Sequence, residues 1–270
     1  EKIEFKLKWL IILGAVGFII CSGIGVTKMR VNTNIIRDLP TSSPLAVATH
    51  FIDENLAGVY SLGFSIERKR PGPLVTVETL QKIDALSDFL EDQPEITKVN
   101  SLALLVKKVH QAREGDASGY KIPEDEAALQ DYLDRMAEAE NPDFWSFISR
   151  DFRRLRLEAR MKAVGTQRGR VMEDRVWNYL KKNFDEDYDV RITGNTVLLG
   201  QMSERLVTNQ VHSLGHAFLV ILTLIIIFFR SYKMGLLACI PNLIPILGLY
   251  GLMGYFKIEL STPTAMISSV

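Results

Sequence analysis

Uncharged stretches and periodically patterned stretches alternate along the chain. Residues 9–27, 206–229 and 234–256 contain no formally charged side chain, and a further apolar stretch covers 261–270. A helix as long as the first stretch, rising 1.5 Å per residue, reaches about 28 Å, close to the thickness of the hydrocarbon layer of a bilayer. The pattern predicts transmembrane helices at 9–27, 213–229 and 234–256 and the start of a fourth at 261–270.

Between these stretches, residues 28–212 combine two kinds of periodicity. Apolar residues alternate with polar ones where a strand is expected, and they recur every three or four positions where a helix is expected. The two kinds of segment form two β-α-β units, which predict a split β-α-β sheet backed by two helices. The predicted elements are a helix over 46–56, a strand over 62–66, a helix over 77–90, a strand over 96–101, a strand over 155–161, a helix over 172–184 and a strand over 188–192.

Two connecting segments, one between the β-α-β units and one after the last strand, complete the predicted fold. The segment between the two units, about 102–150, is expected to be a helical insertion. No proline occurs between Thr196 and Phe229, so one helix of about 52 Å would join the last strand to the second apolar stretch. The predicted fold class is a membrane protein, with an α-helical transmembrane bundle and an α+β external domain, residues 28–212, of the split β-α-β (ferredoxin-like) type.

The distribution of charge sets the expected orientation. The 270-residue chain has 32 basic and 32 acidic side chains, and only nine charged residues lie outside 28–212. Lysines precede the first apolar stretch within residues 1–8, and Arg230 and Lys233 separate the second from the third. Because basic loops favour the cytoplasm, the start 1–8 and the link 230–233 are predicted to be cytoplasmic. The charged domain of this multi-pass protein then lies outside the cytoplasm, in the periplasm or its equivalent.

The first apolar stretch has one alternative interpretation. A secretory signal peptide also begins with lysines, but its apolar region is only about 7–15 residues long, and the stretch here is longer. A membrane span is therefore favoured. Because the sequence begins at Glu1 and stops at Val270 within an apolar stretch, we expect it to be a piece of a longer chain.

No motif typical of enzyme catalysis occurs. The sequence lacks G-x-S-x-G, phosphate-loop, CxxC and HExxH motifs, so we expect a protein that is not an enzyme and has no cofactor or metal. His212 and His216 have metal-ligand spacing, but without a third ligand an interfacial polar pair is favoured. Zero net charge without a basic stripe disfavours nucleic acid as a partner. Cys21 and Cys239 lie in apolar stretches and predict no disulfide framework.

Two groups of residues in the external domain are candidates for ligand binding. Phe144, Trp145 and Phe147 are candidates for a lipid-binding cleft, and core packing is the favoured alternative. The arginines of the strand at 154–160 would suit an anionic head group, although a solvated strand face is favoured.

The apolar stretches contain two further features. Pro241 and Pro245 lack a backbone donor and are expected to bend the third stretch beside the polar Asn242, which makes these three residues candidates for conformational coupling. Small residues recur where a second helix could approach closely, with general helix packing favoured over a sliding surface. They are Gly17, Cys21 and Gly25 in the first stretch and Gly248, Gly251 and Gly254 in the third.

The order of these features resembles one half of a resistance-nodulation-division (RND) transporter. The resemblance is to the hydrophobe and lipid exporter branch, which includes hopanoid and mycobacterial MmpL-like transporters. It covers the whole chain and is weakest over 102–150. The segments that carry it are Asn32-Thr33-Asn34, Leu39-Pro40, Ile192-Thr193-Gly194, Phe229-Arg230-Ser231, Pro241-Asn242-Leu243-Ile244-Pro245 and Leu260 to Met266.

The resemblance implies a multi-pass secondary transporter of the bacterial inner membrane, in which residues 28–212 form a periplasmic domain of the porter type. Such a transporter uses the proton motive force to export or move sterol-, hopanoid- or fatty-acid-like lipids. The implied partners are the membrane, the lipid and protons, and a periplasmic lipid-binding protein or a homo-oligomer is compatible with it. The proton-relay residues would follow Val270, so none is assigned here. Two alternatives stay open: an ABC-type permease for lipoprotein extraction or mechanotransmission, and a sterol-sensing receptor that does not pump.

Overall fold

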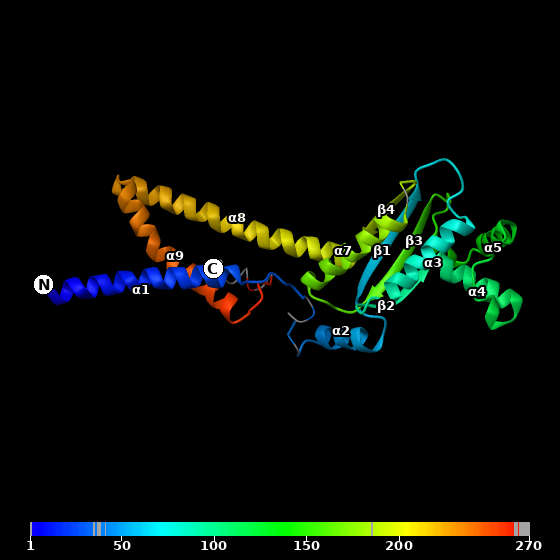
Figure 1. Ribbon diagram of the computed structural model, residues 1–270, viewed down its shortest axis with the longest axis horizontal. Coiled ribbons are helices and arrows are strands. Elements are labelled where there is room, and N and C mark those ends of the chain that lie inside the picture. The colour runs from blue at the N-terminus through cyan, green and yellow to red at the C-terminus, as the bar shows by residue number, and fades with distance from the viewer. Residues whose placement is uncertain are drawn as a thin grey trace. The chain divides into compact units, whose positions relative to one another are not determined.

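The computed structural model describes residues 2–34, 36, 39–40, 42–184, 186–261 and 264, without the side chains of 2–12, 211, 214, 239 and 242. The chain divides into two compact units (Figure 1). The α/β unit comprises residues 39–200, and the helical unit comprises residues 1–38 and 201–270.

The α/β unit is built on a four-stranded antiparallel sheet. β1 (Tyr60–Arg68) lies between β3 (Arg154–Met161) and β4 (Tyr188–Thr193), and β2 (Ile96–Ser101) pairs with the other edge of β3. The resulting order is β2-β3-β1-β4, so each β-α-β unit is split by a strand of the other. The four predicted strands and the split β-α-β arrangement are confirmed.

One face of the sheet is covered by helices. α3 (Val77–Glu91) and α7 (Thr166–Asn183) run along the strands in Figure 1. Alternate side chains of β1 and β3, such as Phe64 and Leu157, are fully buried and share one hydrophobic core with Met172 of α7. Removing apolar surface from water stabilises the fold by roughly 25 cal/mol per Å², so this core is the main source of stability of the unit.

The segment between β2 and β3 is the helical insertion that was predicted. It forms α4 (Leu102–Glu114), a 3-10 turn (Ala117–Gly119), α5 (Glu126–Glu138) and α6 (Pro142–Phe147). The apolar sides of these helices join the same hydrophobic core as the sheet. The insertion is therefore part of the α/β unit.

Two helices flank the sheet in sequence. α2 (Pro44–Asn55) precedes β1, which confirms the helix predicted at 46–56. α8 (Asn195–Phe229) follows β4 and has the predicted extent of 35 residues. Only Gly194, with a positive φ of 110°, separates the last strand from α8. A side chain at Gly194 would clash with the backbone of β1, so glycine is required at this turn.

The helical unit contains α1 (Lys2–Thr27), α9 (Tyr232–Tyr255) and the part of α8 from Gln201 onward. α1 packs along α9. A small core of Val207, Met253 and Leu260 joins α8, α9 and the segment after α9.

The predicted fold class, a transmembrane helical bundle, is wrong. Over the described residues the chain is an α/β protein with nine α-helices and a four-stranded antiparallel sheet, and only α8 and α9 are long and apolar enough to cross a membrane. α1 is a helix over Lys2–Thr27, and its side chains are described from Leu13 onward, so the predicted first span, 9–27, lies only partly within the described residues. Of the predicted fourth span, 261–270, only Ser261 and Thr264 are described. The prediction counted every uncharged stretch as a span, whereas a bundle requires several long apolar helices.

Candidate functional site

The face of the sheet opposite α3 and α7 carries polar side chains and is called the open face here. In β3, exposed arginines alternate with buried apolar residues. β1 and β4 follow a similar alternation, except that Gly63 in β1 is buried. The strand register places Ser65 of β1 opposite both Arg156 of β3 and Arg191 of β4. The open face comprises Ser61, Gly63, Ser65, Glu67, Arg154, Arg156, Glu158, Arg160, Asp189, Arg191 and Thr193.

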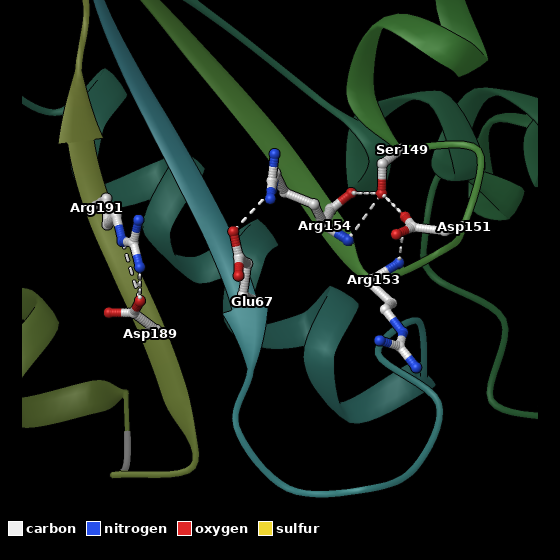
Figure 2. A network of polar contacts seen from close by, with 7 residues as sticks. All are labelled: Glu67, Ser149, Asp151, Arg153, Arg154, Asp189 and Arg191. Atoms are coloured by element: carbon white, nitrogen blue, oxygen red, sulfur yellow. Dashed lines mark hydrogen bonds and ion pairs between the residues drawn. The ribbon is translucent and has the colours of Figure 1, made fainter.

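Figure 2 shows how charged side chains pair at one end of the open face. Arg154 Nε donates to Glu67 Oε1 at 2.7 Å across the two central strands, and Arg191 Nη2 donates to Asp189 Oδ2 at 2.7 Å within β4. The hydrogen bond to Asp189, together with the negative charges of Asp189 and Glu67, raises the pKa of Arg191 above its ordinary value. The side chains of Arg154 and Arg191 remain 62% and 67% exposed, so their guanidinium groups can contact a second anion.

A tight loop fixes the start of β3. The carboxylate of Asp151 accepts hydrogen bonds from Ser149 Oγ and from the backbone N of Arg153, and these bonds lower the pKa of Asp151 (Figure 2). Phe152 lies in the left-handed region with φ 55°, which non-glycine residues adopt at a cost. The loop thereby sets the position at which Arg154 begins the strand.

The aromatic candidates lie in α6, next to this loop. Phe144 is fully buried, and Trp145 and Phe147 pack against the core from its edge. The rings of Phe144 and Trp145 meet edge-on with centroids 4.9 Å apart, and the guanidinium of Arg150 lies 4.9 Å from the Trp145 ring. Phe144 therefore has a packing role, while lipid contact by Trp145 and Phe147 stays a prediction.

In the helical unit, the predicted small residues meet where α1 crosses α9. A Cβ atom on Gly251 would lie 2.7 Å from Ser22 Cα, and Cβ atoms on Gly25 and Gly254 would overlap the backbone of the facing helix. Helices approach this closely only where side chains are absent, so the predicted close packing is confirmed at these glycines. A Cβ atom on Gly17, by contrast, would have no described atom outside its own helix within 4 Å.

The segments that leave α1 and α9 pair with each other. Val31 and Leu260 form a parallel bridge, in which Leu260 N donates to Arg30 O at 2.8 Å and Asn32 N donates to Leu260 O at 3.1 Å. Asn32 Nδ2 also donates to Glu259 Oε1 at 2.9 Å. These two segments carry separate parts of the resemblance, and no sequence pattern indicated that they would meet.

The remaining candidates lie on α8 and α9. α9 continues through Pro241 and Pro245, and the side chain of Asn242 lies outside the described residues. The Nδ1 atom of His216 lies 2.7 Å from the carbonyl O of His212, so this ring bonds to the backbone of its own helix. Within the part of the chain that the structure describes, no three His, Cys, Asp or Glu residues gather in a way that would hold a metal ion.

No protein-family model matches this chain, and no curated protein matches it either. Function is therefore inferred from the residues and their geometry. Two features bear on it: the open face of the split sheet, and the helices α8 and α9, which are long and apolar enough to cross a membrane.

Proposed function

We propose that this chain belongs to an RND-type transporter of the bacterial inner membrane that moves hydrophobic or amphiphilic lipids with the proton motive force. The observation that carries the proposal is the order of the elements: a split β-α-β sheet leads, at Gly194, directly into a helix apolar enough to cross a membrane. The resemblance to lipid exporters rests on the same order of an external split β-α-β domain and membrane spans.

The charges around α8 and α9 support a periplasmic location of the α/β unit. The uncharged part of α8 ends at Phe229, and Arg230 and Lys233 follow at the link to α9. Basic links favour the cytoplasmic side of the membrane. If α8 crosses the membrane from this link, the residues before α8 lie in the periplasm.

The open face supports an amphiphilic substrate with an anionic head group. Arg156 and Arg191 lie opposite Ser65 on the two neighbouring strands. Their side chains pair with Glu158 and Asp189 but remain 60% and 67% exposed. Guanidinium groups bind carboxylate and phosphate groups through charge-assisted hydrogen bonds. A fatty-acid-like lipid therefore fits this face better than an uncharged sterol does.

The test is lipid movement by the full-length protein reconstituted in vesicles with an imposed proton gradient. A fluorescent fatty acid is expected to move only while the gradient lasts, and a protonophore is expected to stop it. Movement that needs ATP instead would identify an ABC-type permease. Binding of the fatty acid without any movement would identify a receptor, and either result would overturn the proposal.

Variants of the open face test the substrate class. Arg156→Gln combined with Arg191→Gln is expected to slow the movement of the fatty acid while leaving that of an uncharged sterol analogue unchanged. Arg168→Gln, which removes an exposed arginine from α7, is the matched control and should change neither rate. Equal effects of the double variant and the control would exclude the open face as the head-group site.

A further inference from the structure

One helix, α2, together with its C-cap, carries five of the nine large apolar side chains that are exposed among the described residues of the α/β unit. Its large apolar side chains point mainly to solvent, although the unit has an extensive core that could have buried them. Between residues 57 and 194, the large apolar side chains that are exposed, among those described, are Tyr120, Phe152 and Val171. On α2 and its C-cap they are Leu45 at 60%, Val47 at 62%, Phe51 at 60%, Ile52 at 38% and Leu56 at 62%.

The apolar side of α2 faces away from the α/β unit. Successive residues of a helix are about 100° apart, so these five side chains cover about half of the circumference. The opposite side holds Ala46, which is buried, and Asp53, whose Oδ1 accepts a hydrogen bond from Ala163 N at 2.7 Å. α2 is therefore attached to the unit by a narrow side, and its wide apolar side is left uncovered within the described residues.

α2 is attached at the end of the sheet from which α8 starts. Asp53 Oδ1 also accepts a hydrogen bond from Val59 N at 3.4 Å, directly before β1. At the same end of β1, Ser61 N donates to the side chain of Asn195, the first residue of α8, at 2.6 Å. The uncharged run of α8 begins at Leu206, about three helical turns further along the chain.

The charges of α2 indicate what kind of surface it fits. The helix contains no lysine or arginine, and its ionisable residues are His50, Asp53 and Glu54. Interfacial helices that depend on anionic lipids carry lysine and arginine on the polar side, whereas binding by apolar area needs no such charge. α2 therefore fits the surface of a neutral lipid layer.

We propose that α2 is an interfacial helix that inserts its apolar side into the surface of the membrane crossed by α8. The inference rests on membrane crossing by α8, which is part of the proposed function, but it does not depend on lipid transport. Contact at this point would hold the α/β unit against the lipid surface beside the start of α8.

Spin labels on the full-length protein in phosphatidylcholine vesicles test this proposal. Labels are placed singly at Val47→Cys and Phe51→Cys, in a chain whose native cysteines are replaced by serine. Val171→Cys on α7 is the matched control, because Val171 is a 54% exposed apolar residue of the same unit. Leu224→Cys in the uncharged run of α8 reports on membrane crossing itself.

Collision rates with oxygen, which concentrates in lipid, and with a water-soluble nickel chelate give the readout. Labels at 47 and 51 are expected to collide more with oxygen, as the label at 224 does, while the label at 171 collides more with nickel. Nickel-accessible labels at 47 and 51, with a lipid-exposed label at 224, would overturn the α2 inference alone. Labels at 47 and 51 shielded from both reagents would show that protein covers α2, which also overturns it. A nickel-accessible label at 224 would overturn membrane crossing and the proposed function with it.

Discussion

The contact between Gly25 of α1 and Gly251 of α9 predicts a large effect of one methyl group. A Cβ atom on Gly25 would overlap the backbone of Gly251, and a Cβ atom on Gly251 would lie 2.7 Å from Ser22 Cα. Because the obstacles are backbone atoms, no change of side-chain rotamer relieves the clash, and the two helices must move apart. Overpacking a close-packed interface costs about 1–3 kcal/mol, so Gly25→Ala is expected to lower the stability of the helical unit by that amount.

Gly17→Ala provides the matched control on the same helix. No described atom outside α1 lies within 4 Å of a Cβ at this position. Alanine favours a helix over glycine by about 1 kcal/mol, so this variant should be neutral or stabilised. The apparent melting temperature of the full-length protein in detergent, measured by scanning fluorimetry, is expected to fall for Gly25→Ala only. Equal melting temperatures for both variants and the unmodified protein would refute the close approach of α1 and α9.

Three further predictions concern the α/β unit. Leu86→Ala leaves a cavity at a fully buried position of α3 and should reduce the free energy of unfolding, measured by urea titration, by about 2–5 kcal/mol. A reduction below about 1 kcal/mol would contradict the burial of Leu86 in the core. Asp125→Ala removes the N-cap of α5 and should lower the free energy of unfolding, measured by thermal unfolding, by about 0.5–2 kcal/mol. An unchanged unfolding midpoint would show that Asp125 does not cap α5. Arg135→Gln removes the hydrogen bond that chiefly lowers the pKa of Asp131, so this pKa should rise in a carboxyl NMR titration. The stabilisation from the Asp131 carboxylate is complete above its unfolded pKa of about 4 and is lost as the pH falls through its lowered folded pKa. An Asp131 pKa that is the same in the variant and in the unmodified protein would contradict the pairing with Arg135.

The strands and their order follow from local patterns in the sequence. Alternation in β3, from Leu155 to Met161, leaves one face apolar, and a shift of one residue would expose that face, so the register is strongly determined. Right-handed crossovers then leave few possible orders for two β-α-β units. The membrane part was less predictable, because the uncharged stretches predict helices, as found in α1, α8 and α9, but do not decide how many of these helices cross a membrane.

The features that the sequence did not reveal depend on contacts between distant residues. The hydrogen bond from Asn32 to Glu259 joins positions 227 apart, and no local periodicity encodes it. The pattern of α2 predicts a helix but does not show which of its sides contacts the rest of the α/β unit. That side is set by a contact with a residue 110 positions away, because Ala163 N donates a hydrogen bond to Asp53 Oδ1.

Labelling from the two sides of the membrane tests most directly whether α8 crosses it. Ser118, an exposed residue of the insertion, and Ser231, at the link between α8 and α9, are each changed to cysteine in a chain without its native cysteines. An impermeant maleimide applied to spheroplasts is expected to label Ser118→Cys, and to label Ser231→Cys only after the membrane is permeabilised. Labelling of both positions from the same side would show that α8 does not cross the membrane and would contradict the placement of the α/β unit in the periplasm.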